Sequence, residues 1–366
     1  MMEKLRQIFK DSFSLFSIIS AGLTLLCILL VLISRASVEA ADLLNSTLCF
    51  WIRRALALVS DILPFSIFAL LVILSPIAVS AIVYFGIRAV KCGRGVRYLV
   101  NFLAALLLVY SGNLLCLGIS YNTTTVDREM NIPIVEVDAD NLASTMISLR
   151  DEINSLAPLI KYENGVSSPD CTMDGISEKI CDSYSEFSRE YGFVPDFYSR
   201  AKDAGPVSYI MSYLGITGIY TYFTGEANVN TCYPAYDTVF TAAHELSHQR
   251  GVLRENEANF MAYIICSRSD DVYLRYSAAL NLYSYIASAL YRTDPDRYYE
   301  IVKELCDDAS GDILASNAVS KKYGDTIFRD ISNFVNDLFL KSHGTDGVVT
   351  YGRVVTLAVS YFEMNK

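Results

Sequence analysis

Three long apolar stretches occupy the first third of this 366-residue chain and limit what it can fold into. They cover residues 15–33, 62–87 and 98–119. A helix needs roughly 20 apolar residues to cross the hydrocarbon core of a bilayer, and each stretch is about that long. The chain is 52% hydrophobic and only 19% charged, which is typical of a multi-pass membrane protein. We therefore predict a membrane domain with three transmembrane helices over residues 1–120, with the lipid bilayer as a partner.

Polar residues interrupt the third stretch at Asn101, Ser111 and Asn113. Such residues mark either a transport pathway or close packing between helices, and we favour packing. None of the three stretches contains Asp, Glu, Lys or Arg. Their absence weakens the alternative that the chain is a transporter or a channel accessory protein.

The basic residues of the short loops predict the orientation of the chain. Lys and Arg accumulate on the cytoplasmic side of membrane proteins. They precede the first stretch and fill the gap between the second and third, whereas residues 34–61, expected as an outer loop, carry mixed charges. We therefore expect residues 121–366 to be extracytoplasmic. The sequence "SVEA" before Ala41 also fits a signal-peptidase site, but cleavage there would not move the C-terminal part.

The C-terminal part, residues 121–366, is predicted to form one mainly helical domain. About 245 residues can bury a hydrophobic core of their own. The net charge of −10 argues against nucleic acid as a partner, because phosphate binding depends on clustered Lys and Arg. Apolar periodicity predicts helices over residues 139–159, 176–191, 235–249, 255–268, 272–291, 295–309, 315–340 and 351–363.

One segment departs from this helical pattern. Residues 215–230, "GITGIYTYFTGEANVN", are rich in Gly, Thr and Tyr and predict a small β-sheet or hairpin. Within it, residues 219–223 could form an edge strand along which a peptide backbone pairs, or a plain core hairpin, and the sequence favours neither. The segment stands directly before a helix with an unusual motif.

That motif is "HELSH", which contains His244, Glu245 and His248. On a helix the two histidines lie one turn apart on the same face, so two imidazole nitrogens can bind one ion. Glu245 lies about 100° further round the helix, where its carboxylate can act as a general base toward a water molecule. This is the arrangement of a zinc metallopeptidase. The alternative is a pair of surface histidines on an amphipathic helix.

The residues that follow offer a third ligand. Gly251 can end the helix in the left-handed conformation and turn the chain back. Glu255 then begins the next helix and is the favoured third ligand, although Glu257 remains a competing candidate because the geometry of the turn cannot be read from sequence. Asn259, one turn after Glu255, could support His244 or Glu255 with a hydrogen bond.

The run "HELSHQRG" followed by "RENEANF", behind three membrane spans, resembles the bacterial membrane family catalogued as domain of unknown function 3810. More broadly, "HELSH" followed by "ENEAN" is similar to the gluzincin metallopeptidases. That resemblance implies a Zn²⁺ site in which Glu255 matches the ligand glutamate. Asn259 stands where an Asp is usual in gluzincins, and Asn cannot carry the charge of that Asp. The family itself implies no known substrate.

A hydrolase also needs a donor that stabilises the oxyanion formed when water attacks a carbonyl group. Tyr351 and His343 are the candidates, and each also fits a structural role. The sequence thus predicts a zinc-dependent enzyme that hydrolyses a peptide or protein substrate. A zinc-binding membrane sensor or scaffold without turnover is the main alternative, and the oligomeric state is left open.

Overall fold

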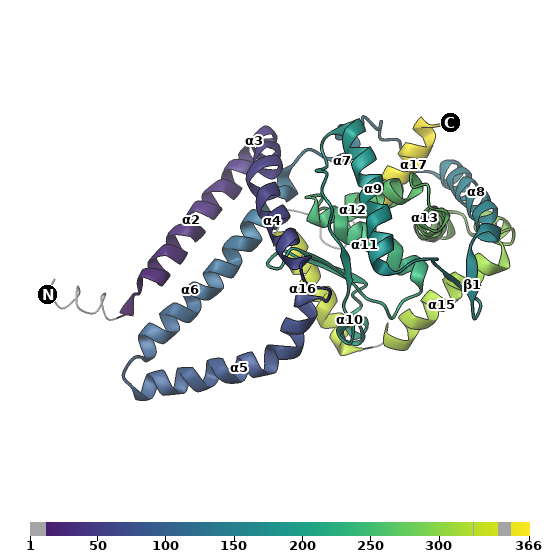
Figure 1. Ribbon diagram of the computed structural model, residues 1–366. Coiled ribbons are helices and arrows are strands. Elements are labelled where there is room, and N and C mark those ends of the chain that lie inside the picture. The colour runs from purple at the N-terminus through teal and green to yellow at the C-terminus, as the bar shows by residue number, and fades with distance from the viewer. Residues whose placement is uncertain (1–11, 325, 343–352) are drawn as a thin grey trace.

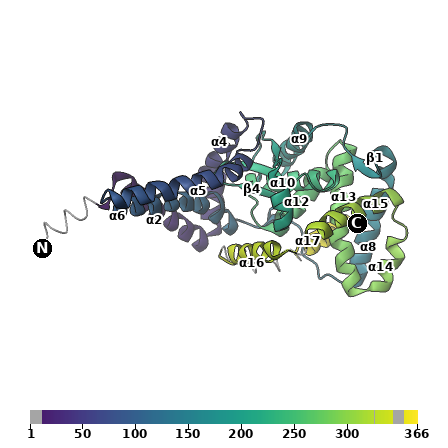
Figure 2. The same cartoon turned by 90° about the horizontal axis from the view of Figure 1, so that it is seen from below.

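The computed structural model describes residues 12–324, 326–342 and 353–366, and it is mainly α-helical, as predicted. Three of its helices are long and apolar enough to cross a membrane. They are α2 (Leu15–Ala36), α5 (Ile67–Lys91) and α6 (Gly95–Asn113), which continues through a π-turn and a 3₁₀ turn to Asn122. Figures 1 and 2 show them as an arm that projects from one end of the rest of the molecule.

Helices α2 and α6 pack along each other, whereas α5 diverges from them (Figure 1). Polar side chains join the packed pair. The Ser14 hydroxyl donates to Asn101 Oδ1 at 2.5 Å, and the hydroxyls of Thr24 and Ser111 lie 2.9 Å apart. Asn101 and Ser111 therefore serve helix packing, as we favoured from the sequence.

The connection between the first two candidate spans, residues 34–61, is largely helical, and its expected position outside the membrane stays a prediction. It contains α3 (Val38–Leu44), a π-turn (Asn45–Cys49) and α4 (Phe50–Ser60). The buried Arg53 side chain holds this segment in place by donating to Asn45 Oδ1 at 2.8 Å and to the Ser120 hydroxyl at 3.1 Å. A buried guanidinium needs such partners, and one of them comes from the far end of α6.

The rest of the chain is built around α13 (Val272–Thr293), which Figure 1 views almost along its axis. It packs against α8, α11 and α12, and α17 closes the same core from a further side. The remaining helices are α7 (Val126–Glu129), α8 (Ala139–Leu156), a 3₁₀ turn (Ala157–Leu159), α9 (Met173–Tyr191), α10 (Val207–Leu214), α11 (Ala235–Gln249), α12 (Glu255–Ser267), α14 (Pro295–Val302), α15 (Asp307–Gly324), α16 (Ile327–Ser342) and α17 (Arg353–Met364).

Most of the predicted helices are confirmed, but the stretch over residues 295–340 divides differently. We expected one helix to end at residue 309 and the next to begin at residue 315. In the structure α14 ends at Val302, and α15 begins at Asp307. The side chain of Asn154 on α8 accepts the Cys306 amide at 2.9 Å, just before α15. A long-range hydrogen bond thus sets a helix boundary that local periodicity cannot show.

The predicted small β-structure is also present. Strand β4 (Gly218–Thr221) pairs antiparallel with β5 (Glu226–Val229), and β5 pairs parallel with β3 (Ala201–Asp203). The strand order is β3-β5-β4, so β4 is an edge strand, and α11 lies against the sheet. A second hairpin, β1 (Lys161–Glu163) with β2 (Val166–Ser168), and helix α10 were not predicted.

A buried ion pair connects this sheet to the apolar arm. Lys202 on β3 and Glu226 on β5 lie 2.8 Å apart, with side chains 6% and 0% exposed. The Glu226 carboxylate also accepts the amides of Ile67 and Phe68 at 2.8 and 2.9 Å, which are the first donors of α5. Glu226 thus satisfies orphan amide groups at the N-terminus of a long helix and complements its dipole. The division into domains at residue 120 stays a prediction.

We expect Glu226→Gln to destabilise the whole protein, because it leaves the Lys202 ammonium buried without a counter-charge. Breaking a buried ion pair in this way costs about 3 to 5 kcal/mol. Thermal unfolding of the purified full-length protein in detergent measures the effect. Asp140→Asn is the control, since it breaks an exposed pair with Arg297 and should leave the midpoint unchanged. A Glu226→Gln variant that unfolds at the wild-type temperature would refute this role.

Candidate metal centre

Helix α11 carries His244 and His248, and it is buried on almost every side. Successive turns place both imidazoles on the same face, where the ring centroids lie 4.6 Å apart and the ring planes are nearly perpendicular, at 84°. The two side chains are 12% and 9% exposed. The motif helix is therefore part of the core, and the alternative of two surface histidines is wrong.

The turn after α11 brings the chain back toward these histidines. Gly251 has a φ of 98°, which L side chains rarely adopt. It also lies close to Arg53, so a Cβ at this position would come within 2.6 Å of the Arg53 guanidinium. Both constraints require glycine, and α12 starts four residues later with Glu255.

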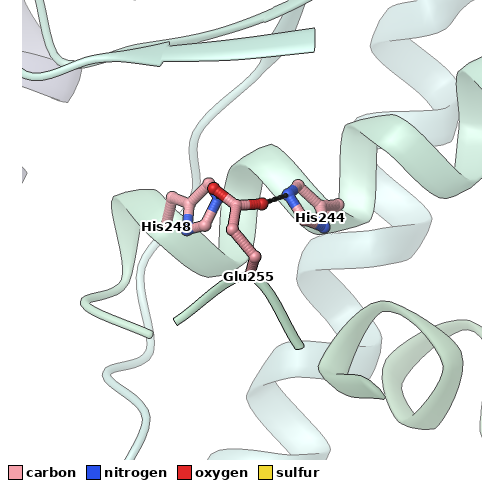
Figure 3. A group of neighbouring side chains, drawn as sticks. All are labelled: His244, His248 and Glu255. Carbon is pink, nitrogen blue, oxygen red and sulfur yellow. Dashed lines mark ion pairs between the residues drawn. The ribbon is translucent and has the colours of Figure 1, made fainter. Parts of the chain in front are cut away.

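Glu255 faces both histidines (Figure 3). Its Oε2 lies 3.3 Å from His244 Nε2, and its Oε1 lies 3.7 Å from His248 Nε2. One ligand atom from each of the three residues lies within 4.8 Å of the others. Tetrahedral ligands about 2.0 to 2.1 Å from a shared ion would be about 3.4 Å apart. The group could therefore hold a metal ion, and its spacing fits the chemistry of the residues.

The Nδ1 atoms of His244 and His248, which point away from Glu255, differ from each other in environment. His248 Nδ1 lies 2.8 Å from the Val252 carbonyl oxygen, to which it can donate, and this leaves the Nε2 lone pair directed at Glu255. His244 Nδ1 is buried and has no hydrogen-bond partner among the described residues. Asn259 lines the same cleft but makes no hydrogen bond to His244 or Glu255 in the described structure, so its predicted supporting role is not observed.

Electrostatic coupling within the group is strong. Burial lowers the pKa of His248, but the Glu255 carboxylate raises it more, to about 9. Burial alone raises the pKa of Glu255, and the two histidines outweigh that effect and hold this pKa well below its ordinary value. Each of these two groups thus favours the charged form of the other. A bound cation would take the place of the imidazolium proton.

Glu245 lies beside the group under strand β4. The side chain is buried, and burial raises the pKa of its carboxyl group, although His244, His248 and the Tyr220 amide act in the opposite direction. Gly218 on β4 allows this close packing, since a Cβ there would lie 2.5 Å from both Glu245 Oε1 and Thr241 Cγ2. The edge strand and the motif helix are thus in direct contact at Glu245.

The competing ligand candidate, Glu257, is directed elsewhere. Arg254 Nη1 lies 3.1 Å from both of its carboxylate oxygens. The other terminal nitrogen of Arg254 donates to the carbonyl oxygens of Tyr121 and Thr123 at the end of the third span. Glu257 therefore anchors the start of α12 to the apolar arm, and Glu255 is the carboxylate that joins the histidines.

A cleft of about 830 Å³ opens over the group. Its walls come from β4, α11, α12, α15 and α16, and from the end of the third span. Sequence reasoning found the motif and left open whether the segment before it forms an edge strand, which the strand order now shows. It missed α16 and the end of the third span, because neither adjoins the motif in the chain. The predicted oxyanion donors, Tyr351 and His343, lie outside the described residues.

The fold and the site together define a mainly helical protein with three potential membrane spans and a His-His-Glu group that could hold a metal ion. The chain belongs to the family described as "Protein of unknown function (DUF3810)", whose sequence model matches residues 44–359. No curated protein and no solved structure was found to match it.

We expect the purified full-length protein to carry about one divalent metal ion per chain, because three ligand groups converge. Glu255→Gln should weaken metal binding at least tenfold and so lower the metal content of the purified protein, since changes to residues that only support ligands already cost that much affinity. Glu257→Gln is the matched control and should keep the ion. Elemental analysis of the monodisperse fraction from size-exclusion chromatography measures both. Metal loss in the Glu257 variant with retention in the Glu255 variant would reverse the assignment.

Proposed function

We propose that this protein is a membrane-anchored zinc metallopeptidase that hydrolyses peptide bonds in a peptide or protein substrate. The observation that carries the proposal is the convergence of His244, His248 and Glu255 beside the buried carboxyl group of Glu245, on the floor of a cleft. Two imidazoles and one carboxylate form the ligand set of catalytic zinc sites that leave a fourth position open.

His244, His248 and Glu255 would hold the ion. Zn²⁺ would supply Lewis acidity, which lowers the pKa of a water molecule and polarises a carbonyl group. The chain supplies the remaining parts. The hydrogen bond from His248 Nδ1 to Val252 orients that imidazole, and the nearly perpendicular rings direct both Nε2 atoms toward Glu255.

Glu245 is the proposed general base. Its carboxylate would take a proton from the water that attacks the peptide carbonyl carbon, and it would then deliver that proton to the leaving amine as the C–N bond breaks. The water oxygen ends in the new carboxyl group. A carboxyl group whose pKa is raised by burial suits this task, because it holds a proton more readily than an exposed one.

Strand β4 is the proposed binding edge for the substrate backbone. It lies at the edge of its sheet, it lines the cleft, and it packs directly on Glu245. A peptide added along such an edge would receive main-chain hydrogen bonds and would place one of its amides near the catalytic carboxylate. The orientation proposed from the basic loops would make this cleft extracytoplasmic. Tyr351 stays a predicted oxyanion donor.

We expect Glu245→Gln to abolish peptidase activity while leaving the metal in place. General-base catalysis contributes about 10² to 10⁴-fold, so the rate should fall by at least about a hundredfold. The test compares cleavage of a diverse peptide library by the full-length wild type and by this variant, with metal content measured on the same samples. Glu255→Gln is the paired control and should lose both metal and activity.

Two results would contradict this assignment. A Glu245→Gln variant as active as the wild type would exclude Glu245 as the base. A metal-loaded wild type that cleaves no peptide in the library would instead favour the zinc-binding sensor or scaffold.

A further inference from the structure

Helix α16 exposes a continuous apolar face. Ile327, Phe328, Ile331, Phe334 and Leu338 are between 53% and 69% exposed. At about 100° per residue they fall within roughly 120° of the helix circumference, so they form one stripe. A monomeric soluble protein rarely leaves so many large apolar side chains together in water.

The polar side of α16 lines the cleft. Arg329, Ser332 and Asn336 line the cleft above the His-His-Glu group, on the side away from the apolar stripe. The helix is therefore amphipathic, with its polar side turned to the candidate site. Its apolar stripe is not needed to attach the helix to the core of the protein.

The position of α16 indicates what the stripe contacts. At the C-terminal end, Arg35 Nη2 on α2 donates to the Ser342 carbonyl oxygen at 3.3 Å. A cavity of about 390 Å³ beside this contact is lined by Leu106 and Tyr110 of α6 together with Phe339 of α16. This end of α16 therefore lies at the domain-side ends of two spans.

The N-terminal end of α16 lies near α10, the helix that packs on the second candidate span, α5. The Thr326 hydroxyl donates to the Tyr213 carbonyl oxygen at the end of α10, at 3.0 Å. Helix α10 in turn packs on the start of α5, where Val207 and Met211 surround Ala69. Helix α16 thus extends from α2 and α6 to the helix that supports α5, across the end of the apolar arm (Figures 1 and 2).

We propose that α16 lies in the interface of the lipid bilayer, with its apolar stripe buried among the lipid headgroups and upper acyl chains. Both ends of α16 lie near the domain-side ends of the candidate spans, and an amphipathic helix beside a span is suited to this depth. Its charges balance, since Arg329 and Lys341 are matched by Asp330 and Asp337. Apolar burial therefore holds the helix, and a zwitterionic bilayer is sufficient.

If the protein is the peptidase proposed above, the position of α16 also indicates which class of substrate can reach the cleft. One side of α16 would be in the bilayer surface while the other lines the cleft, so the cleft would open within a helix diameter of the lipid headgroups. The substrate is then a polypeptide segment presented at the membrane surface, such as the stretch next to a membrane anchor. A freely diffusing peptide would be a poorer substrate.

The first test measures contact between α16 and lipid and needs no enzyme activity. Trp51 is the only tryptophan, so Trp51→Phe gives a background without tryptophan fluorescence. Phe334→Trp places a probe in the stripe, and Asn333→Trp places a matched probe one residue away on the polar side. The full-length proteins are reconstituted in phosphatidylcholine with or without bromine on the acyl chains.

We expect brominated lipid to quench the Phe334→Trp variant at least twice as strongly as the Asn333→Trp variant, at low and high salt alike. Equal and weak quenching of both would overturn the proposal. The proposal would also be overturned if brominated lipid failed to quench the Phe334→Trp probe and its fluorescence changed with protein concentration instead. A second copy of the chain would then cover the stripe.

The second test compares one cleavable sequence, either next to a membrane anchor or as a free peptide, in the same vesicles. We expect the wild type to prefer the anchored form at least tenfold. Phe334→Asp combined with Leu338→Asp should remove this preference while leaving metal content and cleavage of the free peptide unchanged. An unchanged preference in this variant would refute the role of the stripe. If the wild type cleaves neither form, the peptidase proposal fails, whereas the quenching result still decides where α16 lies.

Discussion

The interactions of the Glu226 carboxylate connect the apolar arm to the sheet beside the candidate site. This carboxylate sits on the central strand of the small sheet, pairs with Lys202 and receives the first two amides of α5. The neighbouring strand β4 covers Glu245. One buried carboxylate therefore fixes the start of α5 relative to the small sheet whose edge strand lines the cleft. A residue with this task must be charged and buried, which is costly unless both partners are present.

A second contact extends the same dependence to the metal ligands. Arg53 belongs to α4, next to the arm, yet its guanidinium lies against Gly251 in the turn that returns Glu255 to the histidines. Arg254, one residue before Glu255, holds the carbonyl oxygens of Tyr121 and Thr123 where the third span ends. The ligand turn is thus supported by groups from the N-terminal part of the chain. Cutting the chain near residue 120 would remove Arg53 and would detach Tyr121 and Thr123 from the helix that positions them, so the intact protein is the proper object for metal and activity measurements.

The local parts of this arrangement could be predicted from sequence, and the long-range parts could not. The spacing of His244 and His248 sets their shared face, and Gly251 indicates the turn that brings Glu255 back, because both depend on neighbours within one or two turns. The role of Glu226 cannot be predicted from its neighbours, since its partners Lys202 and Ile67 lie 24 and 159 positions away. Strand β3 has three residues and is defined only by pairing with β5. The helices over residues 38–60 were missed for a similar reason, because Arg53, which holds them in place, is partnered in part by Ser120, 67 positions away.

Charge balance explains why such a site can be buried at all. A divalent ion held by two neutral imidazoles and the Glu255 carboxylate would leave one net positive charge in a poorly solvated place. The Glu245 carboxylate supplies the negative charge that compensates it, so the filled site as a whole would be neutral. Burying Glu245 under Gly218 is then less costly than burying a lone carboxylate, because opposite charges within a few ångströms favour the ionised form. A bound ion would therefore favour the carboxylate form of Glu245, the form in which the proposed base accepts a proton, although the ion itself would be held by His244, His248 and Glu255.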